Sequence, residues 1–316
     1  MRQLYWAVRL VLTLLLLVGC TSIGNREGAE AYYNLGNAYF DLGRLDESKR
    51  AYQRALELDS SLSVATYNLA RLYIEEERYN DAEDILVSLL QQDRGNTILF
   101  ETLGWLSFRR GRYEEAADRY REALDLGVGN AAVWYNLGQI YLILEKEAEA
   151  LEALGEAVYY APESLVYRLG LAEAYNDQGR TSEAADLLYP AFADGARDSD
   201  LLTSLLGYLV EDEEYPGALE VANAALDSLS SRPSPETQEA RASVLYYKAF
   251  TLLVGFEDTA AGLSSLGEAL KAGFDDLESL RRFFEYPELP GLEEVRRLLD
   301  EYGLTPSEDS EGVTEA

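Results

Sequence analysis

Small and apolar residues recur along most of this chain with a period of 34 residues. Counting from Gly36 in steps of 34 reaches Ala70, Gly104, Gly138 and Ala172. Two further registers keep the same period: Ser48, Ala82, Ala116, Ala150 and Ala184, and Ala55, Leu89, Ala123, Ala157 and Ala191. Three registers that share one period indicate an array of structural repeats, because each repeat must bury the same face against its neighbours.

Each 34-residue unit contains two apolar stripes with helical spacing, separated by a turn. In the first unit Tyr32, Leu35 and Tyr39 fall on one helical face. Residues 41–43 then end this helix, and a second helix is predicted over about residues 46–58. The small residues of the 34-residue registers allow the two helices to pack closely. The pattern therefore predicts an all-α fold built from stacked helix pairs.

The spacing resembles the tetratricopeptide repeat (TPR), with its pattern W-x2-L-G-x2-Y…A-x3-F…A…P. The fourth unit is among the best matches, with Trp134, Leu137, Gly138, Tyr141, Ala150, Leu154, Ala157 and Pro162. The resemblance covers residues 29–199 as five regular units. It implies a right-handed α-solenoid of about seven TPR units.

The pattern becomes irregular toward the C-terminus. Residues 200–275 hold two divergent TPR units, and the turn of the first is expected to be one residue shorter, near Tyr215 and Pro216. Residues 276–302 keep apolar positions without the repeat and predict a helical cap, since a solenoid must cover its last apolar face. Residues 303–316 are acidic and are expected to be disordered.

The N-terminus combines charge and a short apolar run. Arg2 and Arg9 precede Leu10–Val18, which is apolar except for Thr13 and is too short to span a bilayer as a helix. The run therefore predicts a signal peptide. The alternative is an ordinary secretory signal or membrane anchor with an incidental cysteine.

The end of this run, residues 17–20, resembles the lipobox of bacterial lipoprotein precursors. The resemblance implies that residues 1–19 are removed, that Cys20 carries the lipid, and that residues 20–28 form a lipidated tether. Thr21, in place of an aspartate, favours the outer membrane facing the periplasm, with the inner membrane or the cell surface left open. A mature protein of this kind is attached to the cell envelope through its acyl chains.

Composition excludes several classes of function. The chain has 27 basic and 57 acidic residues, a net charge of −30, which disfavours direct binding to nucleic acid and to anionic membrane surfaces. It has no histidine and one cysteine, which removes internal disulfides, Cys/His zinc sites and histidine-assisted nucleophiles. The sequence therefore predicts no enzyme activity, no cofactor and no metal, and leaves the oligomeric state open.

The ligands of the resembling family usually lie in a concave groove lined by the first helix of each unit. Mapping those positions gives an aromatic wall with amide groups between the rings, which suits an extended or helical peptide. The alternative is that these side chains only pack between units. The candidate residues are Tyr33, Asn37, Phe40, Tyr67, Arg71, Trp105, Phe108, Tyr135, Gln139 and Tyr208.

One well-defined TPR groove does not fit. Asn37 and Asn68 resemble the asparagines of carboxylate-clamp TPRs, but the basic positions of that clamp are Tyr33, Ile98 and Thr102 here. The sequence instead favours a non-catalytic, membrane-anchored periplasmic adaptor for a protein partner in assembly of an envelope complex. The alternatives are an accessory lipoprotein of a periplasmic solute-uptake system, marked by an enclosed apolar pore, and a self-assembling structural lipoprotein.

Overall fold

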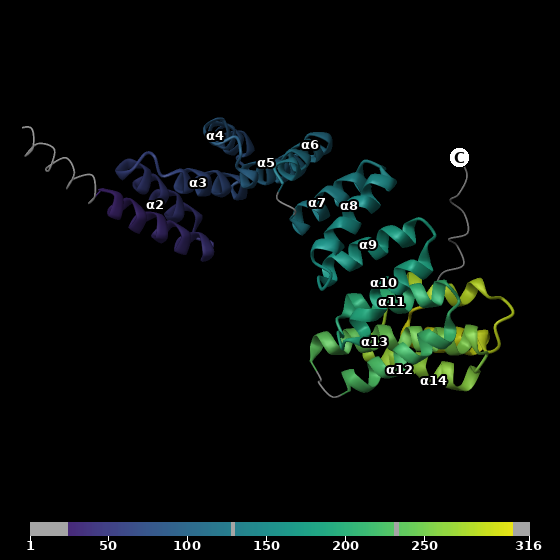
Figure 1. Ribbon diagram of the computed structural model, residues 1–316. Coiled ribbons are helices and arrows are strands. Elements are labelled where there is room, and N and C mark those ends of the chain that lie inside the picture. The colour runs from purple at the N-terminus through teal and green to yellow at the C-terminus, as the bar shows by residue number, and fades with distance from the viewer. Residues whose placement is uncertain (1–24, 128–129, 231–233, 306–316) are drawn as a thin grey trace, which may run out of the picture. The chain divides into compact units, whose positions relative to one another are not determined.

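The computed structural model describes residues 25–127, 130–230 and 234–305, and these residues form helices and connecting turns with no strand among them. The chain forms two compact units (Figure 1), unit 1 over Met1–Lys146 and unit 2 over Glu147–Ala316. Each unit is described by itself. The boundary between them falls inside the fourth repeat, between its two helices.

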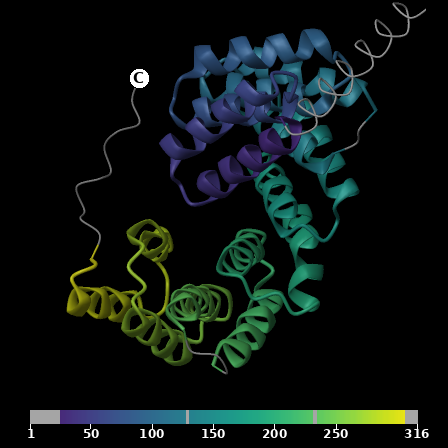
Figure 2. The same ribbon diagram turned by 90° about the vertical axis from the view of Figure 1, so that its left-hand side faces the viewer.

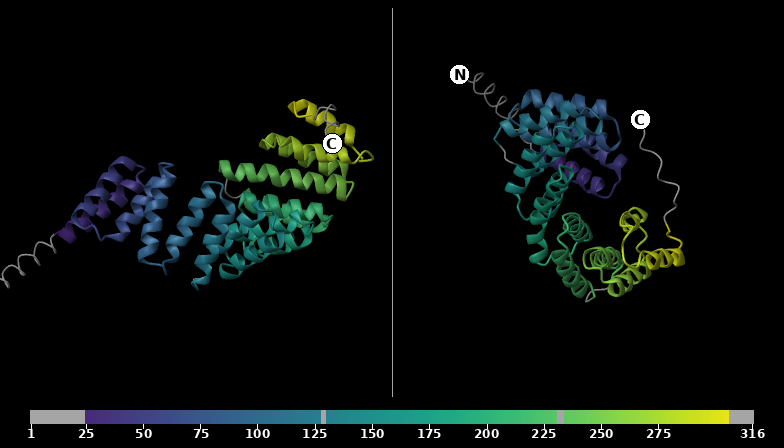
Figure 3. Two further views of the ribbon diagram at one scale, coloured as in Figure 1. Left: turned by 90° about the horizontal axis from the view of Figure 1, so that it is seen from above. Right: turned by 90° about the vertical axis from the view of Figure 1, so that its right-hand side faces the viewer.

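Unit 1 consists of consecutive helix pairs, and helices that are neighbours in sequence from α2 to α7 are also in contact in space (Figure 3). Its helices are the described helix over residues 25–41, α2 (Leu45–Leu58), α3 (Ser63–Glu75), α4 (Tyr79–Gln92), α5 (Thr97–Arg109), α6 (Tyr113–Asp125) and α7 (Ala131–Ile143). The second helix of the first repeat begins within one residue of its predicted start.

Unit 2 continues the pairs and ends in shorter elements. Its regular helices are α8 (Glu147–Tyr160), α9 (Leu165–Asp177), α10 (Thr181–Ala193), α11 (Ser199–Glu211) and α12 (Tyr215–Leu229). They are followed by α13 (Pro235–Phe250), a π-helical turn (Thr251–Gly255), α14 (Thr259–Ala272), α15 (Leu277–Arg281), a 3₁₀ turn (Arg282–Glu285) and α16 (Leu292–Tyr302). The predicted all-α solenoid with a C-terminal helical cap is confirmed.

The turn inside each of the first six repeats has one backbone conformation. In the first repeat, the amide of Arg44 donates to the carbonyl of Tyr39 at 2.9 Å and the amide of Gly43 donates to Phe40 at 2.9 Å. These two bonds form a Schellman motif, whose middle residue has a positive φ. That residue alternates between glycine and glutamate along the chain: Gly43 (φ 68°), Glu77 (56°), Gly111 (70°), Glu145 (57°), Gly179 (71°) and Glu213 (57°).

Small residues set the distance between the two helices of a repeat. A Cβ placed on Gly36 would lie 2.4 Å from the ring of Tyr52, so only glycine fits there. On the facing helix, the buried hydroxyl of Ser48 donates to the carbonyl of Gly36 at 2.9 Å. The 34-residue registers that mark the repeats in the sequence are thus the positions where two helix backbones approach.

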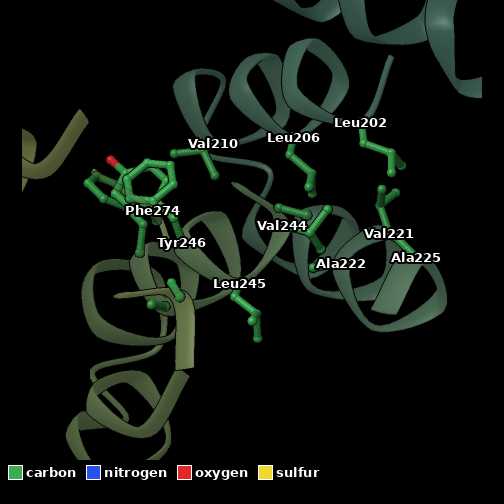
Figure 4. Packing of buried hydrophobic residues seen from close by; sticks show 14 of the residues in the cluster. Leu202, Leu206, Val210, Val221, Ala222, Ala225, Val244, Leu245, Tyr246 and Phe274 are labelled. Atoms are coloured by element: carbon green, nitrogen blue, oxygen red, sulfur yellow. The ribbon is translucent and has the colours of Figure 1, made fainter. Parts of the chain in front are cut away.

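Unit 2 has one continuous hydrophobic core, which joins α9 to α16. Figure 4 shows part of it, where Leu202 and Leu206 of α11 lie near α12 and α13. The ring of Tyr246 is stacked on Phe274 with centroids 4.5 Å apart, and its hydroxyl donates to the carbonyl of Ser279 at 2.6 Å. The cap, in yellow in Figure 2, covers the end of this core, with Phe283 and Leu299 fully buried.

The sequence prediction of a shortened turn in the sixth repeat is wrong. Helices α11 and α12 begin 34 residues after α9 and α10, and the turn over residues 212–214 has the usual length. Pro216 lies in the first turn of α12, where its missing amide hydrogen costs nothing because that position has no partner within the helix. The proline therefore starts a regular helix and does not remove a residue.

The register changes only in the seventh repeat. Helix α13 is extended by the π-helical turn, and the close approach between the two helices of this repeat occurs at Gly262. A Cβ on Gly262 would lie 2.4 Å from the side chain of Leu253 in the π turn. Steps of 34 from Ser48 lead to Leu252, so the inserted helical residues move the small position to Gly262.

Candidate functional site

One face of unit 1 carries a hollow of about 540 Å³, between the first helix and α5. Tyr33 and Tyr67 supply its aromatic walls, and Val64 and Ile98 are apolar side chains that remain 47% and 55% exposed. Exposed aliphatic side chains inside a hollow are unusual for a surface that faces only water, and they provide contact area for a ligand. The polar lining residues include Ser61, Ser63, Asn68, Gln92, Asp93 and Asn96.

A second hollow of about 400 Å³ adjoins the first and shares Tyr67 and Ile98 with it. It extends over α3, α5 and α7, past Arg71 and Trp105, to Asn136. We call the two hollows together the groove. Its central residues are Tyr33, Tyr67, Asn68, Arg71, Ile98, Glu101, Thr102, Trp105, Tyr120 and Asn136.

Asn37 lies behind the groove and holds its neighbours in place. Its Oδ1 accepts hydrogen bonds from the hydroxyl of Tyr52 and from Nδ2 of Asn68, each at 2.8 Å. Because this oxygen already has two donors, it is saturated and cannot take a ligand donor as well. Asn37 therefore orients Asn68, which lines the first hollow.

The hydroxyl groups between the two hollows have a defined direction. Thr102 Oγ1 donates to the carbonyl of Ile98 at 2.7 Å, and it also lies 2.9 Å from the hydroxyl of Tyr67. Because the single proton of Thr102 is used on Ile98, Tyr67 must be the donor in the second contact. The Tyr67 oxygen is then left as an acceptor facing the groove, available to a ligand amide.

The charged groups in the groove are few and of both signs. The guanidinium of Arg71 lies 5.2 Å from the ring centre of Phe40, and that of Arg109 lies 5.3 Å from Trp105, both within cation–π range. Burial raises the pKa of Glu101, and a hydrogen bond from Asn130 lowers it by a smaller amount. A ligand in the second hollow meets the partly buried carboxylate of Glu101 together with Arg71 and Glu75. Arg109, in contrast, only supports Trp105 from outside the hollow.

Tyr120 is the buried member of the groove. Burial raises the pKa of its hydroxyl, against a smaller opposing effect of the hydrogen bond with Asn136. Nδ2 of Asn136 donates to this hydroxyl at 3.4 Å. Tyr120 occupies the repeat position of Tyr52 two repeats later, but its contact differs: the Tyr52 hydroxyl donates to Asn37, whereas the Tyr120 hydroxyl accepts from Asn136.

The structure brings four of the predicted groove residues together, namely Tyr33, Tyr67, Arg71 and Trp105. Phe40 lies beneath Arg71, and Phe108 packs on Tyr113 with ring centres 5.8 Å apart. Tyr135 and Gln139 lie half-buried on α7 without lining either hollow, while Tyr208 belongs to unit 2, where burial raises its pKa to about 12. Cys20, with all of residues 1–24, lies outside the described residues. A binding role for these residues stays a prediction.

Tyr120 and Asn136 are groove residues that the sequence prediction missed. The 34-residue register offers a signal for Asn136, since it follows Asn68 and Thr102 in equal steps. Tyr120 gave no such signal, because it belongs to the second helix of its repeat and its position is a packing position in other repeats. Only the fold shows that its hydroxyl reaches the groove.

Within the three described stretches, no helix combines the length and apolarity needed to cross a membrane. Among the same residues, acidic side chains do not gather in groups of three that could hold a metal ion.

Residues 29–62, 65–98, 101–165 and 165–188 each match a family model of the tetratricopeptide repeat. These stretches fall on the helix pairs whose turns and close contacts are described above. The chain is therefore a tetratricopeptide-repeat α-solenoid, as its sequence predicted. No curated protein matches it in sequence.

The matches to solved structures of the same fold cover a larger part of this chain than the family models do. The structure from the functional characterization of Pseudomonas aeruginosa pilF is 25% identical, with a TM-score of 0.54, and the match covers 69% of this chain and 99% of that one. PilW, titled a widely conserved type IV pilus biogenesis factor, is 16% identical over 66% and 96% of the two chains, with a TM-score of 0.52. A tetratricopeptide repeat protein from Parabacteroides merdae ATCC 43184 is 15% identical over 88% and 99%, with a TM-score of 0.50. The last two show the fold alone.

Proposed function

We propose that this protein is a non-catalytic adaptor, anchored in the cell envelope by a lipid on Cys20, whose groove binds a segment of a protein partner in assembly of an envelope complex. The observation that carries the proposal is the pair of adjoining hollows in unit 1, with Tyr67 and Ile98 in both. TPR proteins in general bind protein partners, which makes a peptide the expected occupant.

The lining of the groove fits a peptide with its backbone exposed. Ile98 and Val64 provide apolar contact, and Trp105 provides a large half-buried ring whose neighbour Arg109 keeps it in place. Asn68 and the acceptor oxygen of Tyr67 offer hydrogen bonds to backbone groups. A few buried aromatic anchors surrounded by polar groups are typical of protein-binding surfaces.

The rival function, an accessory subunit for solute uptake, needs an enclosed apolar cavity. Both hollows of the groove open to solvent along one side, and polar atoms contribute a large part of each lining. This geometry supports docking of a chain segment over enclosure of a small ligand.

The groove is tested in two steps. The full-length protein first captures its partner from the native envelope with a crosslinker, and mass spectrometry identifies the partner. The affinity of the purified partner is then measured for the double variant Ile98→Ser and Trp105→Ala, which should lose at least about 30-fold because both contacts lie at the centre of the groove.

The matched control for this test is Val87→Ser. Val87 is an exposed aliphatic residue of α4 that lines neither hollow, and its replacement should leave the affinity unchanged. Circular dichroism confirms that both variants fold. If the folded groove variant binds as tightly as the wild type, the groove is not the binding site.

The anchor has its own test. Cys20→Ala should move the protein from the membrane fraction of the envelope to the soluble fraction, since no polybasic patch can replace the acyl chains. Continued sedimentation of this variant with membranes, after a salt wash, argues against lipidation.

A further inference from the structure

The first helix of unit 1 leaves a leucine uncovered at a repeat position that is buried in the next five repeats. Leu35 is 42% exposed. The leucines at the same repeat position are almost fully buried, with exposures of 8% for Leu69, 3% for Leu103, 2% for Leu137, 4% for Leu171 and 0% for Leu205. In those repeats the preceding helix pair supplies the cover, as α2 does for α3.

The uncovered side chains form one surface. Tyr32 is 38% exposed and Leu42, at the end of the helix, is 70% exposed. Tyr32, Leu35 and Tyr39 line a shallow and mostly apolar hollow of about 220 Å³ against α2. We call Tyr32, Leu35, Tyr39 and Leu42 the N-terminal face. A solenoid normally ends in a polar surface, which this face is not.

The charge around the N-terminal face differs from that of the whole chain. Residues 25–58 contain five basic and six acidic residues, whereas the chain as a whole carries −30. The first repeat is thus nearly neutral and can approach an anionic surface without the repulsion that the rest of the protein would meet. Tyrosine and leucine side chains at the end of a neutral domain suit the boundary between water and lipid.

The lipid site also lies close in sequence. The described helix begins at Asn25, inside the predicted tether of residues 20–28, so the segment from Cys20 to Asn25 spans at most about 18 Å. The helix itself reaches about 26 Å from residue 25 to residue 41. A lipid on Cys20 would therefore keep the whole N-terminal face within a short distance of the bilayer.

We propose that the N-terminal face rests on the surface of the lipid bilayer, as a second contact beside the acyl chains. The proposal rests on the lipid anchor described under Proposed function. Residues 10–18 of the same chain are not available as a cover, because residues 1–19 are absent from the mature lipidated protein to which this proposal applies. A second copy of the chain is the remaining competitor, and the experiment distinguishes it.

The experiment places an environment-sensitive fluorophore at Leu35→Cys in the mature lipidated protein, where Cys20 has no free thiol. The matched control is Leu277→Cys in unit 2, since Leu277 is 44% exposed against 42% for Leu35. Both proteins are added to vesicles of phosphatidylethanolamine and phosphatidylglycerol at a ratio of about three to one, and quenching by lipids with a nitroxide on the acyl chain is recorded. We expect a blue shift and strong quenching at residue 35, and neither at residue 277.

Three results would overturn the proposal, and they differ from one another. If the protein floats with the vesicles while residue 35 reports water, the anchor is real and the face does not touch lipid. If the lipidated protein does not float with the vesicles, the proposed lipid anchor is wrong, and the proposed membrane contact of the N-terminal face is wrong as well. If residue 35 is blue-shifted without vesicles and the mass doubles with concentration, the face joins two copies.

A second variant measures the contribution of the face to retention. Leu35→Asp with Leu42→Asp changes exposed residues only, so the fold should survive. Its transfer between vesicles should be about tenfold faster than that of the wild type, because apolar area no longer enters the interface. The control variant, Leu277→Asp with Val166→Asp, should transfer at the rate of the wild type. Equal transfer rates for the wild type and both double variants would contradict the proposal.

Discussion

In unit 2 one hydrophobic core runs through every helix from α9 to the cap, whereas the core cluster of unit 1 is confined to α3, α4 and α5. Both units use the same repeat and the same turn. They differ at repeat positions where the tetratricopeptide pattern does not specify a residue type. Asn68, Thr102 and Asn136 occupy one such position in unit 1, and the next residue in that register is the buried Gly170 of unit 2.

This difference shows how one repeat can provide either a binding surface or a stable end. Where polar and aromatic side chains fill the unspecified positions, they remain partly exposed and form the groove. In unit 2, buried apolar side chains such as Leu206 and Phe250 join the helices in one continuous core. We therefore expect the two units to respond differently to the same kind of substitution.

The largest effect is expected in the cap. Phe283→Ala should destabilise the protein by about 3–5 kcal/mol, because Phe283 is fully buried and contacts the rings of Tyr246 and Phe250. Chemical denaturation followed by circular dichroism measures the loss. Phe108→Ala, at a half-buried ring of unit 1, should cost clearly less, and equal losses would mean that the two units do not differ in core packing.

The next effect concerns the close contact inside the first repeat. Gly36→Ala should cost about 1–3 kcal/mol, since its Cβ would enter the ring of Tyr52. Gly155→Ala is the control in unit 2: nothing lies within 4 Å of its Cβ, so alanine should stabilise α8 by about 0.5–1 kcal/mol. Thermal melting should show a lower melting temperature for Gly36→Ala and a higher one for Gly155→Ala. A Gly36→Ala variant as stable as the wild type would refute the close contact with Tyr52.

A smaller effect is expected at the turns, where glutamate alternates with glycine. Glu77→Gly should stabilise the protein by about 1 kcal/mol, because a positive φ is strained for glutamate and free for glycine. Gly111→Glu should cause a loss of similar size by the same argument. The two midpoints in urea should move in opposite directions; a shift in the same direction would show that the side chains have other roles.

The smallest effect depends on pH. Burial raises the pKa of Glu101 in the folded protein, so the native state holds this proton more tightly and ionisation at higher pH disfavours folding. Glu101→Gln should therefore raise the melting temperature near pH 7, within the range of about 0.5 kcal/mol typical of partly exposed sites. The gain should vanish as the pH falls below the raised pKa.

The control for this pH effect is Glu114→Gln, at an exposed position of α6 that removes the same charge. Its melting temperature relative to the wild type should not follow the pattern of Glu101→Gln. A gain at Glu101 that is the same at pH 4 and pH 7 would show that burial of the carboxylate is not its cause.

The fold could be predicted from the sequence because its strongest constraints are local and repeated. Gly36 and Ser48 mark places where two backbones meet, and these places hold glycine, alanine or serine in each of the first five repeats. The predicted shorter turn of the sixth repeat is wrong because a proline such as Pro216 at the start of a helix is compatible with the regular turn length.

The groove could be predicted only in part. Tyr33, Tyr67, Arg71 and Trp105 follow from their place on the first helix of each repeat. The sequence could not show that Asn37 is saturated by Tyr52 and Asn68, since hydrogen bonds between side chains depend on the packing of two repeats. The sequence also could not show that Tyr120 lines the groove, because its hydrogen bond with Asn136 depends on the packing of two repeats.

The central claim is that the partner binds in unit 1, and one pair of positions tests it most directly. Ile98 and Val166 occupy the same repeat position two units apart and are similarly exposed, at 55% and 59%, but only Ile98 lines the groove. A photo-crosslinking amino acid is placed at either position in the full-length protein in its native envelope, and the adducts are quantified. We expect a partner adduct from residue 98 and little or none from residue 166; equal adducts, or an adduct from residue 166 alone, would contradict binding in unit 1.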